Sequence, residues 1–214
     1  MSATAESARG SRLPRSARRR SLLAAAQDLF VAGGYHATAM DDIAERAGVS
    51  KPVLYQHFPS KLELYLALLD DNVTALSRQV RQALASTTDN AERVRRCIAA
   101  YFDFVSDPGG AYRLVFESDL RSESAVRDRV ERSLRLSVEA LAETIAADTG
   151  LGRDEAELLS CGLAGLAEVS ARYWLSGPGE SRLAQGRAVH LLAELAWRGI
   201  SGYPLVAVSR AGEE

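Results

Sequence analysis

The sequence predicts an all-α protein of about nine helices. Apolar residues recur at spacings of three and four over most of the chain, whereas the strict alternation of a half-buried strand is almost absent. Glycine and proline fall between these periodic segments, where they end helices. Apolar residues make up 47% of the 214 residues, which is ample for a packed core.

The first helix is expected at about 15–31. Leu22, Ala26 and Phe30 follow one another at intervals of four and would share one apolar face. The pair Gly33-Gly34 then provides a stop, because glycine is a poor helix former and tolerates the conformations in which helices end.

Two short helices joined by a tight turn are expected at about 39–58. Thr38, with Asp41 three residues later, resembles a capping box at the start of the first helix. Gly48 supplies a residue that can adopt a positive φ in the turn, and Ser50 is a favourable N-cap for the second helix.

The second short helix has one buried and one exposed face. Pro52 suits its first turn, and Leu54 and Phe58 are four residues apart and would point inward. The other positions carry groups that can bond base edges, touch a thymine methyl group or contact phosphates. They are Lys51, Val53, Tyr55, Gln56 and His57. This pattern predicts a helix that enters a DNA groove.

The rest of the chain continues as helices. Ser60 and Glu63 form a capping box for a long helix with apolar residues at spacings of three and four. Another helix is expected to start near Asn90 and to stop at Asp107-Pro108. The remaining pieces are expected at about 110–119, 122–148, 153–176 and 180–200.

The segment GYHATAMDDIAERAGVSKPVLYQHFPSKLELYLALL resembles the N-terminal DNA-binding domain of the TetR/AcrR family of transcriptional repressors. The match covers roughly residues 18–70 and depends on Gly34-Tyr35, the turn 47–50, the run 54–58 and Lys61. The resemblance implies an N-terminal three-helix helix-turn-helix domain. It also implies that the remaining helices dimerise and hold a small-molecule pocket.

With this resemblance, the expected domains are a disordered basic arm at 1–14, the DNA-binding domain at 15–60, the effector-binding and dimerisation domain at 61–202 and a disordered tail at 203–214. The residues expected to contact DNA are Arg18, Thr38, Met40, Ser50, Lys51, Pro52, Val53, Tyr55, Gln56, His57 and Lys61.

Two further sites are expected in the C-terminal helices. Small residues are frequent in the last two helices and allow close approach, either within one subunit or in a four-helix dimer interface, which we favour. The interface candidates are Gly162, Gly165, Glu168, Val189, Leu192 and Ala196. Aromatic side chains in the middle helices suit either a core or an effector pocket. The pocket candidates are Tyr101, Phe102, Val105, Tyr112, Phe116, Glu117, Arg172, Tyr173 and Trp174.

Charge, cysteine content and hydropathy indicate what kinds of site and location the sequence disfavours. The net charge is −2, but six arginines and one acidic residue lie in the first twenty positions, a phosphate-binding pattern that is also compatible with a solvated tail. Cys97 and Cys161 form no metal-binding spacing, so we expect free thiols, no metal and no cofactor. No apolar run is long enough to span a membrane, and no targeting signal follows the arginines, so we expect a cytoplasmic protein.

The expected function is a homodimeric transcriptional regulator, most simply a repressor released from a pseudo-palindromic operator by a small lipophilic effector. The alternatives are a regulator without a ligand and a non-specific nucleic-acid-binding protein. An enzyme is disfavoured because the sequence has no nucleophile elbow, phosphate loop or HExxH motif. No motif encodes the effector, the operator and its target genes, or the choice between repression and activation.

Overall fold

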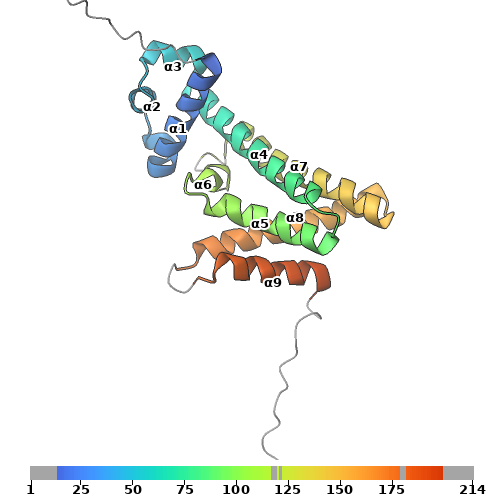
Figure 1. Ribbon diagram of the computed structural model, residues 1–214. Coiled ribbons are helices and arrows are strands. Elements are labelled where there is room, and N and C mark those ends of the chain that lie inside the picture. The colour runs from blue at the N-terminus through green and yellow to red at the C-terminus, as the bar shows by residue number, and fades with distance from the viewer. Residues whose placement is uncertain (1–13, 117–119, 121, 179–181, 200–214) are drawn as a thin grey trace, which may run out of the picture. The chain divides into compact units, whose positions relative to one another are not determined.

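The computed structural model describes residues 14–116, 120, 122–178 and 182–199. Within these residues the chain forms nine α-helices and no strand (Figure 1). The all-α prediction and its count of about nine helices are therefore confirmed. The expected tail, and the expected arm apart from Pro14, lie outside the described residues.

The first of two compact units ends at Leu68. It contains α1 (Arg15–Ala37), α2 (Met40–Arg46), α3 (Lys51–His57) and the start of α4 (Lys61–Ala85). Leu22, Ile43 and Leu54, one from each of the first three helices, are fully buried. Their burial joins α1 to two helices of seven residues each, α2 and α3, which would be marginal as isolated helices.

Helix α1 is interrupted at the predicted glycine pair. Gly34 has non-helical φ 78° and ψ 169°, a conformation that other residue types rarely adopt, and a second helical segment continues across this kink to Ala37. The first regular segment therefore ends close to the expected stop. The rings of Phe30 and Tyr35 both contact Tyr65 on α4, with 5.3 Å between centroids in each pair. These aromatic contacts hold the end of α1 against α4.

The predicted capping box at the start of α2 is wrong by one residue. The N-cap is Ala39, whose backbone N–H donates to Oδ2 of Asp42 at 3.2 Å. Thr38 turns the other way, and its hydroxyl donates to the carbonyl oxygens of Gly34 at 2.8 Å and Leu29 at 3.3 Å. Thr38 therefore satisfies carbonyls at the end of α1 instead of amides of α2.

The second unit begins at Leu69 and contains the rest of α4 and five further helices. They are α5 (Asn90–Ser106), α6 (Ala111–Phe116), α7 (Ser124–Thr149), α8 (Arg153–Ser176) and α9 (Gln185–Arg198). Helix α7 packs against α8, and α5 packs against both α8 and α9 (Figure 1). None of the helices among the described residues is both long enough and apolar enough to cross a membrane.

Local chemistry explains where α4 and α5 begin. The Ser60 hydroxyl accepts a hydrogen bond from the Glu63 N–H at 3.1 Å, as the predicted start of the long helix α4 requires. Asp89 caps α5 by accepting from the N–H groups of Ala91 and Glu92. The last helix starts at Gln185, later than the expected 180.

Candidate DNA-binding surface and effector cavity

Helix α3 presents a polar face and buries an apolar one. Leu54 is fully buried, and Phe58, which follows the helix, is 2% exposed. Lys51, Tyr55 and Gln56 are exposed. Of the other residues of this helix that were expected to contact DNA, Pro52 is exposed, and Val53 and His57 are half-buried. The exposed face therefore carries a cation, a phenol and an amide within two turns.

The turn before α3 fixes the angle at which the helix is presented. Gly48 has φ 65°, its N–H donates to the Glu45 carbonyl at 3.0 Å, and Val49 N–H donates to the Ala44 carbonyl at 3.0 Å. These bonds close the C-terminus of α2 and confirm the predicted role of Gly48. Ser50 occupies the N-cap position of α3 but makes no capping bond with its side chain.

Charged groups surround both ends of α3. Lys51 Nζ lies 2.9 Å from Asp41 Oδ1, an ion pair between two exposed side chains. At the other end, the pKa of His57 is lowered below its ordinary value of 6.5. The main cause is desolvation by burial, and the positive charges of Arg15, Arg18 and Arg19 add to it. The start of α1 and the end of α3 thus form one cationic region.

Three of the residues expected to contact DNA point into the protein. Thr38 is 6% and Met40 9% exposed, so their side chains pack within the unit. Lys61 Nζ donates to the carbonyl oxygens of Tyr35 at 2.8 Å and Thr38 at 2.9 Å, and it lies 4.4 Å from the centre of the Tyr35 ring. Its charge therefore binds the carbonyl end of α1, where a cation is favourable.

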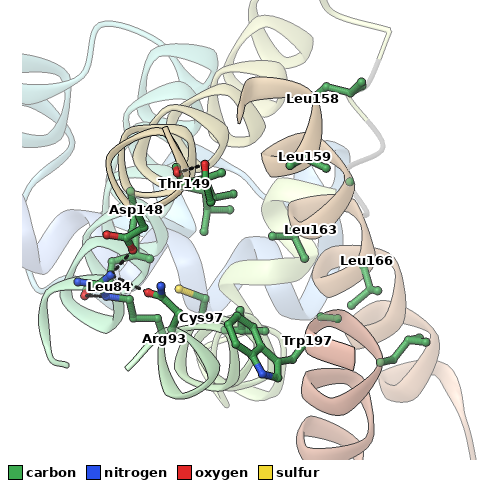
Figure 2. Close-up of a pocket in the computed structure, with 18 residues that line it drawn as sticks. Leu84, Arg93, Cys97, Asp148, Thr149, Leu158, Leu159, Leu163, Leu166 and Trp197 are labelled. Atoms are coloured by element: carbon green, nitrogen blue, oxygen red, sulfur yellow. Dashed lines mark hydrogen bonds and ion pairs between the residues drawn. The ribbon is translucent and has the colours of Figure 1, made fainter. Parts of the chain in front are cut away.

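An apolar cavity of about 750 Å³ lies in the second unit (Figure 2). Leucines of α8 line one side, and Arg93 of α5 and Asp148 of α7 lie opposite (Figure 2). Trp197 of α9 is 51% exposed at the rim. The aliphatic lining residues are Leu84, Val94, Leu141, Ile145, Leu158, Leu159, Leu163, Leu166, Leu195 and Ala196. The volume lies in the range of small-molecule sites.

Cys97 contributes a neutral thiol to the cavity wall. Its side chain is buried, and desolvation raises the pKa of the thiol from 9.0 to about 12 despite the nearby positive charge of Arg93. A smaller void of about 30 Å³ also borders Cys97 and reaches Tyr101. Burial raises the pKa of Tyr101 to about 12. The part of the cavity wall that Cys97 forms is therefore uncharged at neutral pH.

The cavity does not contain the residues expected to line an effector pocket. Tyr101, Phe102, Val105 and Tyr112 are buried core residues, and none of them lines the 750 Å³ cavity. The side chain of Phe116 and all of Glu117 lie outside the described residues, and Arg172 lines neither this cavity nor the groove described below. Sequence reasoning followed aromatic content and missed the closely spaced leucines of α8, which were the available signal.

A second groove, of about 720 Å³, lies between α8 and α9 near the ends that their loop connects. Phe102, Tyr173 and Trp174, three of the expected pocket residues, line it. The Trp174 indole N–H donates to the Leu183 carbonyl at 2.7 Å, and the Arg182 guanidinium lies 4.9 Å from the Trp174 ring. This groove is continuous with an exposed surface of α8.

That surface is an uncharged stripe on α8. Leu158, Val169 and Tyr173 are 75%, 54% and 81% exposed. Gly162 and Gly165 lie between them at helical spacing, and a Cβ atom added at either would meet no atom within 4 Å. Of the other expected interface residues, Glu168, Leu192 and Ala196 are half-buried and Val189 is buried within its own chain.

Comparisons with known proteins agree with this architecture. A family model described as "Bacterial regulatory proteins, tetR family" matches residues 22–68. The HTH-type transcriptional activator FasR of Mycolicibacterium smegmatis is 47% identical over 197 residues, which cover 92% of this chain and 89% of that protein.

Solved structures show the same fold over most of the chain. A TetR-like transcriptional regulator from Rhodococcus sp. RHA1 has a TM-score of 0.65 at 31% identity and covers 90% of this chain and 100% of its own. The regulator FadR from Bacillus subtilis, solved in complex with stearoyl-CoA, has a TM-score of 0.68 at 18% identity, with coverages of 85% and 98%, and it supports the fold alone. Together with the outward face of α3, these similarities show that the chain belongs to the TetR family of DNA-binding transcriptional regulators.

Proposed function

We propose that this regulator is a homodimer whose two α3 helices read a pseudo-palindromic operator, and that an amphipathic effector in the apolar cavity controls its DNA affinity. The observation that carries the DNA-binding part is the polarity of α3. Leu54 anchors the helix in the core, while Lys51, Tyr55 and Gln56 are exposed. A helix anchored in this way can lie in a major groove with its outer side chains against bases and phosphates.

The exposed residues of α3 differ in what they can recognise. Gln56 offers a donor and an acceptor and suits the edge of an adenine, whereas Tyr55 and Lys51 suit phosphates. Lys51 would exchange Asp41 for a phosphate, and Arg18 belongs to the cationic region, since its charge helps to lower the pKa of His57. Thr38, Met40 and Lys61 make internal contacts, so we leave them out of the proposed contact set.

The homodimer is supported by the uncharged stripe of α8. Large apolar side chains rarely remain exposed in a row on a monomer. Gly162 and Gly165 would allow the same helix of a second copy to approach closely. A dimer with two-fold symmetry would carry two α3 helices, as an operator with two half-sites about 34 Å apart, or a multiple of that distance, requires.

The effector is proposed from the chemistry of the cavity. Aliphatic side chains form most of its wall, and Arg93 and Asp148 are the charged residues among its described lining. This combination suits a molecule with a long apolar chain and an acidic head. The stearoyl-CoA complex of the FadR neighbour shows that this fold can hold such a molecule, although its 18% identity carries no residue roles over.

The direction of regulation, activation or repression, is proposed from the similarity to FasR of Mycolicibacterium smegmatis. That protein is named an activator, whereas the family resemblance favoured repression. We propose activation as the primary output, with repression at sites that overlap a promoter. A reporter carrying the selected operator upstream of, and then within, a promoter separates the two outputs.

One experiment tests DNA recognition. Genomic fragments bound by the purified protein are sequenced, and the preferred site is compared with a scrambled site in gel shifts. Gln56→Ala is expected to weaken binding to the preferred site by about 1–3 kcal/mol, because one bidentate base contact is lost, and to leave the scrambled site unaffected. Gln79→Ala, at an exposed position on α4, is the matched control.

The alternatives give different results in the same assay. Equal losses on both sites would assign Gln56 to the backbone and contradict base reading. No preferred site at any salt concentration would indicate a non-specific nucleic-acid-binding protein. Stearoyl-CoA and laurate are then added to the gel shift, and an unchanged DNA affinity with both would indicate a regulator without this class of effector.

A further inference from the structure

One arginine connects three helices at the polar edge of the apolar cavity. Arg93 Nε donates to the carbonyl oxygens of Leu84 at 3.2 Å and Thr87 at 2.9 Å, at the end of α4. Its Nη1 donates to Asn90 Oδ1 at 2.8 Å and to Asp148 Oδ2 at 2.6 Å (Figure 2). The guanidinium therefore joins the ends of α4 and α7 to the start of α5.

The contacts of Arg93 to α4 and to α7 differ in what they do for these helices. A cation at the last carbonyls of α4 is favourable, because the C-terminal end of a helix carries partial negative charge. Asp148 lies in the last turn of α7, where an acid is unfavourable for the same reason. The ion pair with Arg93 compensates that repulsion. If Asp148 lost this partner, the last turn of α7 would be weakened, while the Arg93 contacts to α4 could persist.

We propose that Arg93 and Asp148 form a latch at the edge of the apolar cavity, and that an acidic amphiphile opens it by taking the Arg93 guanidinium from Asp148. This inference rests on the effector cavity of the proposed function and assigns its switch. The apolar chain of the ligand lies among the leucines of α8, and its acidic head replaces the Asp148 carboxylate. The end of α7 is then released from α4 and α5.

The surroundings of the latch favour an acid over a neutral head. Arg93 is the positively charged residue in the described lining, and its side chain is 19% exposed, so an acid that reaches it is partly shielded from water. Asp148 is 33% exposed and can turn to solvent once displaced. A neutral head would gain the same apolar contacts but would leave the ion pair closed.

Two probes that differ in the head group test the proposal without DNA. Laurate and dodecanol share their chain, and their affinities for the full-length protein are measured by isothermal titration calorimetry. We expect laurate to bind more tightly. Asp148→Asn removes the internal competitor, and should raise laurate affinity about two- to fivefold, the worth of a partly exposed ion pair, without changing dodecanol affinity.

The reciprocal variant removes the receptor of the acid. Arg93→Gln should reduce laurate affinity to that of dodecanol. If the glutamine variant unfolds, Arg93→Lys replaces it in the same measurement, because lysine retains the charge but loses the fork of donors. Glu157→Gln is the matched control, because it breaks the exposed pair with Arg153 on α8. That variant should leave both affinities unchanged.

A structural readout follows the latch itself. Hydrogen exchange of the amides in the last turn of α7 should accelerate when laurate binds the unaltered protein, and laurate should have a smaller effect on it in Asp148→Asn, where no ion pair is left to open. Equal affinities of laurate and dodecanol in the unaltered protein would overturn the proposal, as would slower exchange in this turn with laurate. Selective laurate binding and faster exchange without any effect on DNA affinity would retain the latch and contradict the effector control proposed above.

Discussion

At the scale of single residues, Lys61 shows how a motif position can have a role other than contact with DNA. The family resemblance placed it among the DNA-contacting residues. In the structure its ammonium group donates to the carbonyls of Tyr35 and Thr38 and faces the Tyr35 ring. Those groups meet it through the fold, from positions more than twenty residues away, so no local pattern could reveal them.

Lys61→Met should therefore act on stability before it acts on DNA. Loss of charge-assisted hydrogen bonds should lower the free energy of unfolding by about 1–3 kcal/mol, measured by urea denaturation. Arg20→Met, at an exposed site on α1, should change it by less than about 0.5 kcal/mol. The salt dependence of DNA binding should be unchanged. A slope smaller by about one unit with normal stability would show that Lys61 contacts a phosphate.

Cys97 offers a second test at this scale. Desolvation raises the pKa of its thiol from 9.0 to about 12, and the thiolate is the form that reacts with alkylating agents. At pH 8 the thiolate fraction should therefore be about a thousandfold smaller than in the unfolded chain, where the pKa is ordinary.

The reaction is followed by mass spectrometry in Cys161→Ser, which leaves Cys97 as the one thiol of the sequence. Its alkylation rate by iodoacetamide in the folded protein is divided by the rate in urea. The ratio should be about one-thousandth or less at pH 8 and should rise as the pH increases towards 12. A ratio near one would show that the wall of the cavity opens to solvent much more than its buried position implies.

At the scale of helices, the boundaries set by neighbouring residues were predictable. Gly48 and the Ser60–Glu63 contact act within one turn of the helix that they end or begin, and both behave as expected. Gly34 also behaves as expected, since its non-helical φ and ψ interrupt α1. Thr38 does not follow this rule. Its hydroxyl donates to the carbonyls of Gly34 and Leu29 in α1 instead of accepting from an amide of α2.

The turn between α2 and α3 can be tested with a pair of glycines. A Cβ atom at Gly48 or at Gly186 of α9 would meet no atom within 4 Å, so neither substitution by alanine creates a clash. Gly48 has φ 65°, however, and an alanine there should lower the free energy of unfolding by about 1–2 kcal/mol. Gly186→Ala should raise it by up to about 1 kcal/mol.

Both values come from urea titrations of the full chain. DNA affinity should fall for Gly48→Ala, because the turn orients α3, and should be unchanged for Gly186→Ala. If the two substitutions had the same effect on stability, the positive φ of Gly48 would not be a constraint on this turn.

At the scale of the whole molecule, the sequence indicated the fold more clearly than the cavity. Periodicity and caps define helices one at a time, which is why the all-α architecture could be predicted. The cavity forms where α5, α7, α8 and α9 meet around aliphatic residues, and the leucines of α8 are the one part of its lining that a single segment contains. Tyr101 and Tyr112 were expected to line an effector pocket, but large rings pack efficiently and here they fill the core.

The uncharged stripe of α8 predicts that the chain forms a homodimer through this helix. Val169 lies between Leu158 and Tyr173 on the uncharged face, so Val169→Glu would place two carboxylates close together across a two-fold axis. Sedimentation velocity at micromolar concentration should give a dimer for the unaltered chain and a monomer for Val169→Glu. Gln79→Glu adds the same charge at an exposed position on α4 and should remain dimeric.

The effect on DNA follows from the geometry of paired half-sites. A monomer has one α3, so Val169→Glu should lose more than about tenfold in affinity for the complete operator and should bind it no better than an isolated half-site. Circular dichroism and thermal unfolding establish that the variant is folded, since Val169 is exposed in the single chain. A folded Val169→Glu dimer that still prefers the complete operator would move the interface away from α8. A monomeric unaltered chain that reads the complete operator would remove the need for a two-fold axis.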